Sequence, residues 1–442
     1  MIKVITYGTY DFLHFGHINL LKRAKALGDY LIVGVTADDF DRRRGKINVQ
    51  QSLEERIAAV QATGLADQII IEEYEGQKID DIRRYEVDIF TVGSDWVGYF
   101  DYINEYCKVV YLPRTQGVSS TDIRKESGSL NLGLVGYSAY LKKIFNESKF
   151  VNGLTIKGVY THDTVKLADI LPDMEVVTED YDELLSQVDG VFIHSHPSLH
   201  YEQIKKALSQ QKHVLCESPL CESEAQCKEL FQLAETNGCV LMDGLKTAYA
   251  VAYARMLLLI KSGKIGDVIS VDATCTSLRT SSNFSSVKQE WDSISAWGTF
   301  GMLATFQILG TSYKQKQVVV KSEADKEVFT DIQLMYEHAV AHIKAGTGVK
   351  SEGSLIVSGT KGYLYVPSPW WNTNYFELRY EDPTENKRYF YQMDGEGIRY
   401  GLIEFLHAIQ HGKADFYLAH DISIAIAKVI EETQKGLDTI YI

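Results

Sequence analysis

Residues 2–17 have the sequence IKVITYGTYDFLHFGH, and this stretch decides the fold of the first domain. The apolar run at residues 2–7 predicts a strand, and the two histidines after the glycine-containing turn predict the start of a helix. His14 and His17 are three residues apart and therefore share one face of that helix. Gly16 lies between them and leaves no side chain that could block a phosphate. This order of strand, turn and helix predicts an anion site in an α/β domain.

Two imidazoles beside the peptide N–H groups of a helix start suit a phosphate that gains negative charge during a reaction. Such a site needs no covalent nucleophile, because an acceptor phosphate oxygen can attack the α-phosphorus of a nucleoside triphosphate directly. The residues therefore indicate nucleotidyl transfer. The motif alone also leaves open a structural interpretation, in which the histidines only cap a helix.

A second phosphate-type loop follows the apolar stretch at residues 109–112. It combines a guanidinium, a glycine and hydroxyl side chains ahead of another predicted helix, and these groups bind phosphate oxygens in proteins. Its members are Arg114, Thr115, Gly117, Ser119, Ser120 and Thr121. Two such loops in one segment favour nucleotidyl transfer over a helix cap and over a domain that only binds a ligand.

Five short motifs occur in order along the first 128 residues. They are Tyr-Gly-Thr-Tyr-Asp at 7–11, His-Phe-Gly-His at 14–17, Leu-Gly-Asp-Tyr at 27–30, Gly-Ser-Asp-Trp at 93–96 and Tyr-Leu-Pro-Arg-Thr at 111–115. Through them this segment resembles the glycerol-3-phosphate cytidylyltransferase family. The resemblance implies a doubly wound α/β, Rossmann-like fold of the HxGH nucleotidyltransferase type. It also implies CTP as donor, a small polyol phosphate as acceptor, and release of pyrophosphate with a divalent metal such as Mg²⁺.

The resemblance further implies roles for individual residues. His14 and His17 would hold the triphosphate around its α-phosphate, Arg114 its β and γ phosphates, and Lys46 the acceptor or the triphosphate. The implied nucleotide-binding residues are Tyr7, Gly8, Thr9, Tyr10, Asp11, Gly16, Gly93, Asp95, Trp96, Thr115, Gly117, Ser119, Ser120 and Thr121. Metal ligands stay unassigned, because Ser94 stands where the family usually has a second acid. Residues 64–67 also lack the family's Arg-Tyr-Val-Asp sequence, which leaves arginine-mediated pairing of subunits open.

The whole chain has 442 residues, of which 45% are hydrophobic, so two or three domains with their own cores are expected. Its net charge of −14 argues against nucleic acid as a partner. The six cysteines show no CxxC spacing and predict reduced thiols, and no stretch is long and apolar enough to span a bilayer. These features predict a cytoplasmic protein without membrane or nucleic-acid partners.

A second region begins after the polar residues 125–129. The apolar run 130–135 leads through Gly136 into a predicted helix, which is the place of a dinucleotide fingerprint. Only the first glycine of that fingerprint is present, because Ser138 replaces the second and Leu141 the third. Further strand-like runs alternate with helical segments and predict a parallel sheet; they are residues 154–160, 188–193 and 212–217.

Four stretches of this region carry a second resemblance: residues 196–200, 207–208, 214–219 and 262–266. Through them residues 130–442 resemble the glucose–fructose oxidoreductase and inositol dehydrogenase family. The resemblance implies a Rossmann domain followed by an α+β domain with an open, mostly antiparallel sheet. We therefore expect domains at residues 1–128, 129–245 and 246–442.

The redox chemistry of that second family is poorly matched. Its Glu-Lys-Pro triplet has lost the lysine to Ser218, and its acid–base pair is replaced by Ala296 and Phe300. Loss of a general base costs about 10² to 10⁴ in rate, so a redox-inactive region is expected, with Asp292 as the only acid near that pair. The implied cofactor contacts are Gly136, Ser138 and Glu217, and NAD(P) binding is doubtful on these grounds.

Two further features leave alternatives open. Lys246 follows a neighbouring predicted strand and either replaces the lost lysine or is an ordinary solvated side chain. His194, His196 and His200 are close in sequence, but a zinc site there has no visible fourth ligand.

The combined interpretation is a cytidylyltransferase whose second region has become a structural, dimerising or ligand-sensing module. The alternative is a bifunctional enzyme, in which the second region reduces a keto precursor with NAD(P)H and the first domain activates the product with CTP. Glycerol phosphate is the expected acceptor and CDP-glycerol the expected product, for bacterial teichoic acid or capsule-like polymers. Both resemblances imply a homodimer or a higher homo-oligomer.

Overall fold

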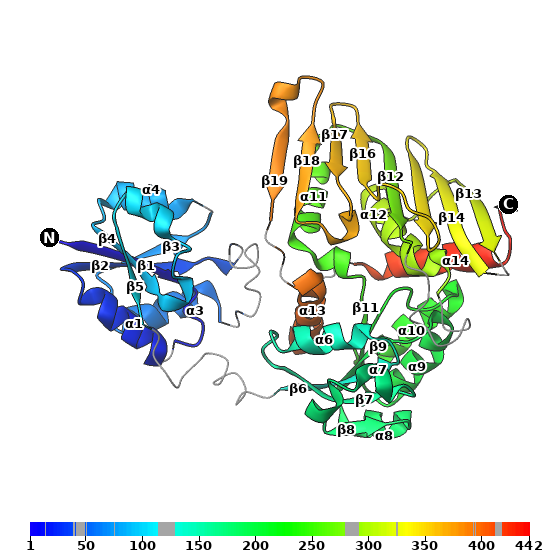
Figure 1. The fold of residues 1–442 in the computed structure, drawn as a ribbon, viewed down its shortest axis with the longest axis horizontal. Coiled ribbons are helices and arrows are strands. Elements are labelled where there is room, and N and C mark those ends of the chain that lie inside the picture. Colours follow the sequence, from blue (N-terminus) through cyan, green and yellow to red (C-terminus); the bar gives the residue numbers. More distant parts are fainter. Residues whose placement is uncertain are drawn as a thin grey trace. The chain divides into compact units, whose positions relative to one another are not determined.

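The computed structural model describes the chain in two compact units, Met1–Ser129 and Leu130–Ile442, and each unit is treated by itself (Figure 1). The described residues are 1–13, 15–38, 40, 49, 51–74, 76–113, 129–278, 291–323, 326–391, 393, 395–411 and 418–442. No helix among these residues has the length and apolar character that crossing a membrane requires.

The first unit is a parallel sheet in the order β3-β2-β1-β4-β5 with helices on both faces. The central strands are buried on both faces, which explains their continuous apolar runs. One hydrophobic cluster, around Leu21 and Val60, packs on one face, and a second, around Ile82 and Phe90, on the other. This is the predicted doubly wound fold. The elements are β1 (Lys3–Gly8), α1 (Phe15–Lys25), β2 (Tyr30–Thr36), α3 (Leu53–Ala62), β3 (Gln68–Glu72), α4 (Gln77–Tyr85), β4 (Ile89–Gly93), η1 (Ser94–Trp96), η2 (Asp101–Glu105) and β5 (Lys108–Leu112).

The second unit begins with another parallel sheet, in the order β11-β10-β9-β6-β7-β8. This sheet confirms the predicted Rossmann fold. Its elements are β6 (Leu130–Gly136), α6 (Tyr140–Ser148), β7 (Leu154–Tyr160), α7 (Thr164–Leu167), η3 (Leu171–Asp173), β8 (Val176–Thr178), α8 (Tyr181–Gln187), β9 (Gly190–His194), α9 (Pro197–Ser209), β10 (His213–Cys216), α10 (Glu224–Thr236) and β11 (Leu241–Asp243).

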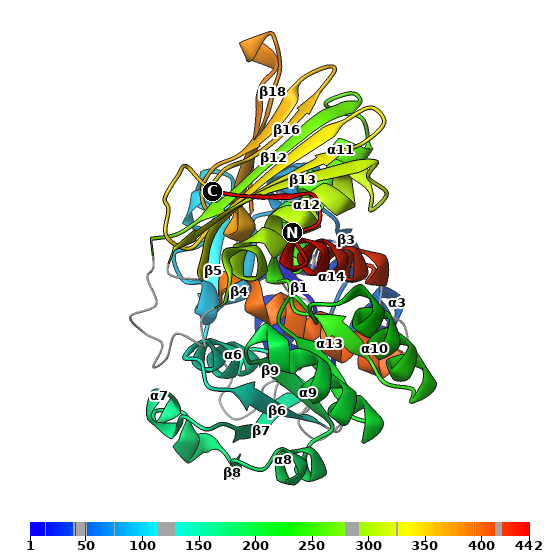
Figure 2. The same ribbon diagram turned by 90° about the vertical axis from the view of Figure 1, so that its right-hand side faces the viewer.

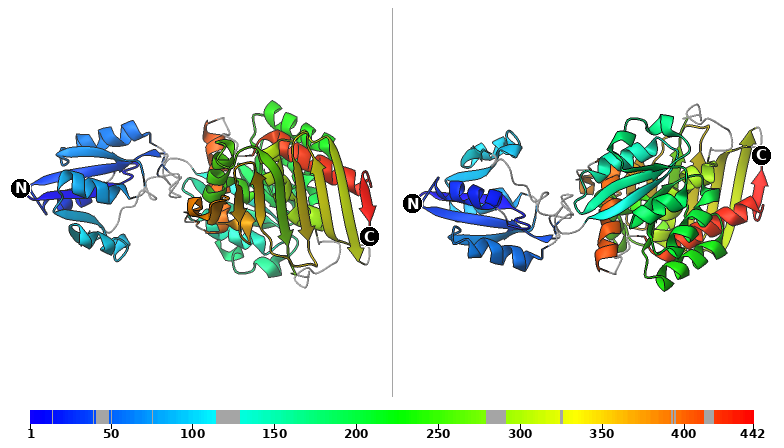
Figure 3. Two further views of the ribbon diagram at one scale, coloured as in Figure 1. Left: turned by 90° about the horizontal axis from the view of Figure 1, so that it is seen from above. Right: turned by 90° about the horizontal axis from the view of Figure 1, so that it is seen from below.

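The rest of the second unit is built on a mixed sheet in the order β19-β18-β17-β16-β12-β15-β14-β13-β20 (Figure 3). Its pairs are antiparallel except β12 with β15 and β13 with β20, as the predicted open, mostly antiparallel sheet requires. The strands are β12 (Val268–Thr276), β13 (Gln315–Glu323), β14 (Lys326–Met335), β15 (Val340–Gly346), β16 (Leu355–Gly359), β17 (Tyr363–Val366), β18 (Tyr375–Arg379), β19 (Lys387–Phe390) and β20 (Thr439–Tyr441).

Helices from the second half of the sequence join the two sheets of this unit. α12 packs against β12 and β15 and also contacts α14, which in turn packs against α10 of the first layer (Figure 2). α13 returns to the Rossmann layer and packs against α6, where Arg399 Nε donates to Glu147 Oε2 at 2.7 Å. The helical elements are η4 (Lys246–Tyr249), α11 (Val251–Lys261), η6 (Ile294–Gly298), α12 (Thr299–Leu309), α13 (Ile398–His411) and α14 (His420–Gln434).

Candidate functional site

The carboxyl edge of the first sheet brings together predicted site residues from the ends of β1 and β4 and from the start of α1. The chain builds β2 and β3 on one side of β1 and then crosses to β4 and β5 on the other, so the topological switch point lies between β1 and β4. Ligands of open α/β sheets bind at such a point. Gly8 ends β1, Gly93 ends β4 and leads into Trp96, and α1 with Gly16 and His17 begins beside them.

The turn between β1 and α1 has an unusual backbone. Tyr10 and Phe12 have φ values of 56° and 47°, which non-glycine residues adopt at a cost of about 1–3 kcal/mol. Tyr10 is buried, and its ring meets the His17 ring edge-on with 5.6 Å between centroids. A Cβ at Gly8 would lie 3.0 Å from the Tyr10 ring, so the glycine leaves room for it. Packing thus holds His17 against a strained turn.

Arg56 anchors this turn and was missed by the sequence analysis. Its side chain is fully buried, and Nη1 donates to the carbonyl oxygens of Thr9 and Thr36 at 2.8 Å each. Nε donates to Gln51 O at 3.1 Å, and Nη2 is paired with Asp38. One guanidinium therefore ties the site turn to the end of β2 and the start of α3. A single arginine in an amphipathic helix carries no motif, so burial alone reveals it.

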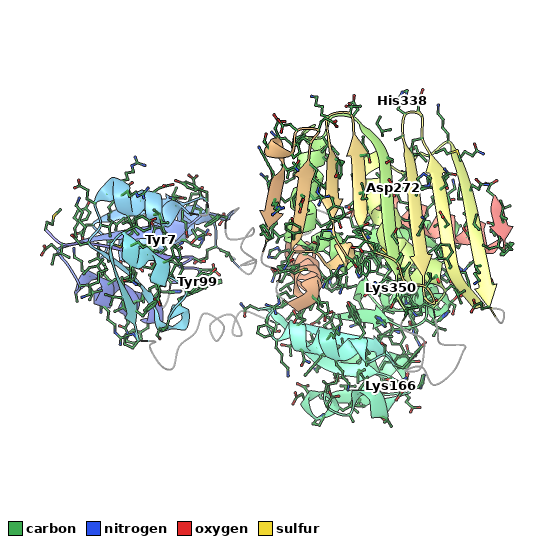
Figure 4. All side chains as sticks on the ribbon, turned by 45° about the horizontal axis from the view of Figure 1, so that its top comes forward. Tyr7, Tyr99, Lys166, Asp272, His338 and Lys350 are labelled. Carbon is green, nitrogen blue, oxygen red and sulfur yellow. The ribbon has the colours of Figure 1, made fainter. Side chains whose placement is uncertain are left out.

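Two predicted nucleotide contacts have intramolecular roles in this structure. Asp11 is buried, and its Oδ1 accepts the N–H of Gln51 at 3.0 Å. Tyr7, labelled in Figure 4, lies in the cluster on the α4 side, where its hydroxyl donates to Asp81 Oδ2 at 2.9 Å. Lys78 lies over the Tyr7 ring, 4.7 Å from its centroid. Contact of these two side chains with a nucleotide remains a prediction.

The other predicted contacts of this domain divide into two groups. Thr9 lies at the switch point with its carbonyl on Arg56, and Pro113 O accepts Arg23 Nη1 of α1 at 2.6 Å, so the chain ahead of the second predicted phosphate loop passes beside α1. The positions outside the described residues are His14, Lys46, Arg114, Thr115, Gly117, Ser119, Ser120 and Thr121, and the side chain of Asp95 is likewise not described.

The second unit repeats the arrangement of strand, glycine turn and helix at its own switch point, between β6 and β9. Gly136 pairs with His194 across these strands and has a φ of 139°, and a Cβ there would lie 2.2 Å from the His194 carbonyl oxygen. Ser138 Oγ accepts the N–H of Tyr140, the first residue of α6, at 3.1 Å. The first glycine of the fingerprint is therefore kept and fits a dinucleotide fold, while Ser138 occupies an N–H that a pyrophosphate would otherwise use.

The three histidines near this switch point do not gather as ligands. His194 is enclosed between Tyr140 and Trp291, with ring centroids at 4.7 and 5.5 Å, and burial lowers its pKa to about 4. His200 has its ring nitrogens 2.8 Å and 3.1 Å from two backbone carbonyl oxygens, and His196 caps α9. Within the described ranges no group of three His, Cys, Asp or Glu side chains is placed to hold a metal ion.

Lys246 is mostly buried, so its interpretation as an ordinary solvated lysine is wrong. It begins η4 directly after β11, and its side chain is only 16% exposed. Burial lowers its pKa, and the carboxyl groups of Glu217 and Glu396 oppose that shift. The Glu217 side chain is partly buried, with its Oε2 shielded from solvent; burial raises its pKa to about 8, and Lys246 counteracts the rise. Ser218, in the place of the family's lysine, instead approaches Asp243 Oδ2 at 3.3 Å.

The two other positions of lost redox chemistry carry no acid–base group. Ala296 lies in η6, and Phe300 is the second residue of α12, with its ring centroid 6.2 Å from that of Trp297 and 6.4 Å from that of Trp371. Asp292 is partly buried, and burial raises the pKa of its carboxyl.

Two family models match this chain, one in each of its two units. A family model described as Cytidylyltransferase-like matches residues 5–126, and one described as Oxidoreductase family, NAD-binding Rossmann fold, matches residues 130–245. Glycerol-3-phosphate cytidylyltransferase of Bacillus spizizenii is 48% identical over 130 residues, which are 29% of this chain and 100% of that protein. The protein of the same name from Staphylococcus aureus is 45% identical over 126 residues, 28% of this chain and 95% of that protein.

Solved structures share the fold of the second unit. KijD10, a 3-ketoreductase from Actinomadura kijaniata in complex with NADP and TDP-benzene, has a TM-score of 0.64 at 18% identity, covering 71% of this chain and 100% of that chain. UDP-N-acetylglucosamine 3-dehydrogenase GnnA from Acidithiobacillus ferrooxidans has a TM-score of 0.59 at 15% identity, covering 70% and 98%. Identities this low show the fold alone.

The motifs, the switch-point geometry and the full-length match of a relative all concern the first 130 residues. The chain therefore belongs to the cytidylyltransferase-like family and is a nucleotidyltransferase, followed by a region with a Rossmann fold whose residues 130–245 match the oxidoreductase family model.

Proposed function

We propose that the first domain transfers the cytidylyl group of CTP to a polyol phosphate, with glycerol phosphate as the acceptor, and releases CDP-glycerol and pyrophosphate. The observation that carries this proposal is the 48% identity over the whole length of a glycerol-3-phosphate cytidylyltransferase. The product feeds bacterial cell-surface polymers such as teichoic acid or capsule. The protein acts in the cytoplasm as a homodimer or a higher homo-oligomer.

The proposed reaction is a direct displacement. A phosphate oxygen of the acceptor attacks the α-phosphorus of CTP, the bond to the bridging oxygen breaks, and pyrophosphate leaves. His17 and His14 donate to the oxygens of the α-phosphate, where charge develops, and the N-terminus of α1 adds its peptide N–H groups. Arg114 and the hydroxyls of residues 119–121 hold the β and γ phosphates, and Lys46 neutralises the incoming phosphate.

The proposed reaction uses Mg²⁺ bound to the phosphates of the substrate. The described part of the chain contains no cluster of three metal-ligating side chains, and Mg²⁺ commonly binds substrate phosphates with only one or two carboxylates. The metal neutralises charge on the triphosphate when it is bound.

The test is pyrophosphate release from CTP and Mg²⁺ with a panel of sn-glycerol 3-phosphate, glycerol 2-phosphate and ribitol 5-phosphate. Release with a glycerol phosphate, and CDP-glycerol as product, supports the proposal. Release only with ribitol 5-phosphate would replace the acceptor but keep the reaction. Absence of release with every acceptor would refute the assignment of this domain.

A second candidate function is the reduction of a keto precursor by the second unit, so that the chain is bifunctional. Burial of Lys246 beside Glu217 favours it, because a cation absent from the Glu217-Ser218-Pro219 triplet is supplied from η4. Gly136, Ser138 and Glu217 would contact NAD(P), which supplies a hydride when bound. Consumption of NADPH with dihydroxyacetone phosphate separates this candidate from a redox-inactive module.

A further inference from the structure

Three aromatic side chains lie together at the carboxyl edge of the first sheet, where β4 leads into η1. The ring centroid of Trp96 is 5.4 Å from that of Tyr99 and 5.8 Å from that of Phe100. Tyr99, labelled in Figure 4, also meets Phe100 edge-on with 5.0 Å between centroids. Edge-on and tilted pairs at these distances are favourable arrangements of aromatic rings. Trp96 is a predicted nucleotide contact, whereas the proposed reaction gives Tyr99 no role.

The backbone after Trp96 brings the Tyr99 ring back onto the indole. Val97 has a φ of −54° and a ψ of 127°, and Gly98 has a φ of 85°, which are the values of a type II turn. Glycine is favoured at the third position of such a turn, because φ is positive there. The N–H of Tyr99 donates to the Trp96 carbonyl oxygen at 3.0 Å and closes the turn. The chain therefore reverses directly after Trp96, and the two side chains meet.

Phe100 connects this group to the core of the domain. It is buried, and its ring centroid lies 5.2 Å from that of Phe90 in β4. The N–H of Phe100 donates to the hydroxyl of Tyr111 at 3.2 Å, and this hydroxyl donates to Asp101 Oδ1 at 2.7 Å. Phe100 is therefore a fixed support for the Trp96 indole.

Tyr99 differs from Phe100 in its exposure. Its side chain is 57% exposed, so burial in the core does not account for its contact with Trp96. The Trp96 side chain is itself partly buried and meets Tyr99 on the exposed part of the group and Phe100 on the buried part. Two ring contacts restrict the rotation of the indole. Restricting a side chain before a ligand arrives lowers the entropy that binding has to offset.

The two sides of this switch point differ in their chemistry. On the β1 side are His17 and the start of α1, which suit phosphate groups. On the β4 side is the Trp96 indole, and aromatic rings bind nucleobases by stacking, because every base has a π face. A nucleoside triphosphate carries both kinds of group. Its phosphates suit the β1 side and its base suits the β4 side.

We propose that the cytosine of CTP stacks on the Trp96 indole, and that Tyr99 is a positioning residue that holds this indole in its binding orientation. The inference rests on the proposed cytidylyl transfer and adds to it a residue that determines the affinity for CTP. In this role Tyr99 touches no reacting atom. It therefore affects the binding of CTP and leaves the chemical step unchanged.

The first test compares the kinetics of Tyr99→Ala and Tyr99→Phe in the full chain, as pyrophosphate release with a glycerol phosphate. We expect Tyr99→Ala to raise KM for CTP about two- to tenfold, the effect of losing one aromatic contact. The value of kcat should stay within about twofold, because the contact is the same in the bound and the transition state. Tyr99→Phe should keep the natural KM, since an edge-on contact needs the ring and not the hydroxyl. An unchanged KM in Tyr99→Ala, a fall in kcat alone, or an equal rise in KM in Tyr99→Phe would overturn the role of Tyr99.

Tyr106→Ala is the matched control. Tyr106 is another exposed tyrosine of the connection between β4 and β5, but its ring lies against Arg83, whose guanidinium carbon is 4.9 Å from the ring centroid. It directly precedes the start of β5, at the edge of the sheet opposite Trp96. KM for CTP should be natural in this variant. A rise equal to that of Tyr99→Ala would overturn the inference, because the effect would then belong to the whole connection.

The second test observes Trp96 without turnover. The full chain contains five tryptophans, and after labelling with 5-fluorotryptophan the Trp96→Phe variant identifies the fluorine resonance of Trp96. CTP and Mg²⁺ without acceptor should shift this resonance in the natural protein. In Tyr99→Ala the resonance should lie elsewhere before CTP is added, and more CTP should be needed to shift it, whereas Tyr99→Phe should match the natural protein. A Trp96 resonance that does not respond to CTP, or that is the same with and without the Tyr99 ring, would overturn the inference.

The failure of this inference and that of the proposed function give different results. Pyrophosphate release in a protein whose Trp96 resonance ignores CTP would refute the stacking on Trp96 and keep cytidylyl transfer. A Trp96 resonance that responds to CTP, in a protein that releases no pyrophosphate with any acceptor of the panel, would refute the transfer and keep the nucleotide contact.

Discussion

Each of the two parallel sheets of this protein has a topological switch point, but different residues border the two switch points. In the first unit the crevice between β1 and β4 is bordered by the strained turn of Tyr10 and by the start of α1. In the second unit the crevice between β6 and β9 has its glycine, but Ser138 Oγ accepts the first N–H of α6, and Tyr140 packs on His194. Both carry the backbone of a nucleotide site. Only the first keeps side chains that suit charge on a phosphate.

This difference indicates that the fold determines where a site lies, whereas the side chains at the site determine its chemistry. In the first unit the buried Arg56 side chain holds the site turn through hydrogen bonds to the carbonyl oxygens of Thr9 and Thr36. In the second unit Glu217 and Lys246 lie beside one small cavity at the ends of β9 and β10.

The largest effect is expected from His17→Ala, which tests whether the first unit carries the reaction. We expect pyrophosphate release to fall by about a hundredfold or more, because the imidazole stabilises charge that develops in the transition state. Thermal unfolding of the first unit should change little, since His17 is only partly buried. A variant with near-normal turnover would show that the crevice between β1 and β4 is not the reaction site.

The next effect concerns Arg56→Met. This change leaves two carbonyl oxygens at the end of β2 and in the site turn without their donor, and we expect a loss of about 2 kcal/mol in the free energy of unfolding. Calorimetry of the full chain should show a lower transition for the first unit and an unchanged one for the second. Glu54→Gln, an exposed change on the same helix, is the matched control. Lost turnover with unchanged stability would mean that Arg56 acts on the substrate instead.

The sequence predicted the first domain well because its motifs are local. A strand, a glycine turn and a histidine pair lie within sixteen residues, and their physical roles follow from that spacing. Arg56 could not be predicted in the same way, because its partners are backbone carbonyls and an aspartate distributed over residues 9–51. Backbone acceptors leave no trace in the sequence.

In the second region the fold could be predicted from the sequence, but the surroundings of individual side chains could not. The parallel sheet of its Rossmann layer followed from alternating strands and helices. The burial of Lys246 did not follow, because it depends on α13 arriving from 150 residues further along the chain to close the cavity. The sequence shows that Ser218 stands where the family has a lysine. Whether a lysine from another element lies near that position can be seen only in the fold.

The next prediction concerns the pH dependence of the stability of the second unit. Glu217 has a pKa near 8 in the folded protein against about 4.3 when unfolded, so the folded state binds the extra proton and stability falls as pH rises through this window. Asp243 acts in the same direction but only up to its pKa of about 6. Glu217→Gln should therefore flatten the fall of the second unit's melting temperature between pH 6 and pH 8. An equal slope in both proteins would place the titrating group elsewhere.

The smallest effects are expected where the two units are compared directly. Ser138→Ala removes the acceptor of the Tyr140 N–H at the start of α6, and Phe300→Ala removes a ring that packs on Trp297 and Trp371; both changes lie in the second unit. Pyrophosphate release should stay within about twofold of the natural protein in both variants, because the proposed reaction uses only groups of the first unit. Ser138→Ala should at the same time lower the stability of the second unit by about 1 kcal/mol, the usual net contribution of one hydrogen bond. If either change abolished pyrophosphate release while the first unit still melted normally, the two crevices would be energetically coupled and the second would act as a regulator of the first.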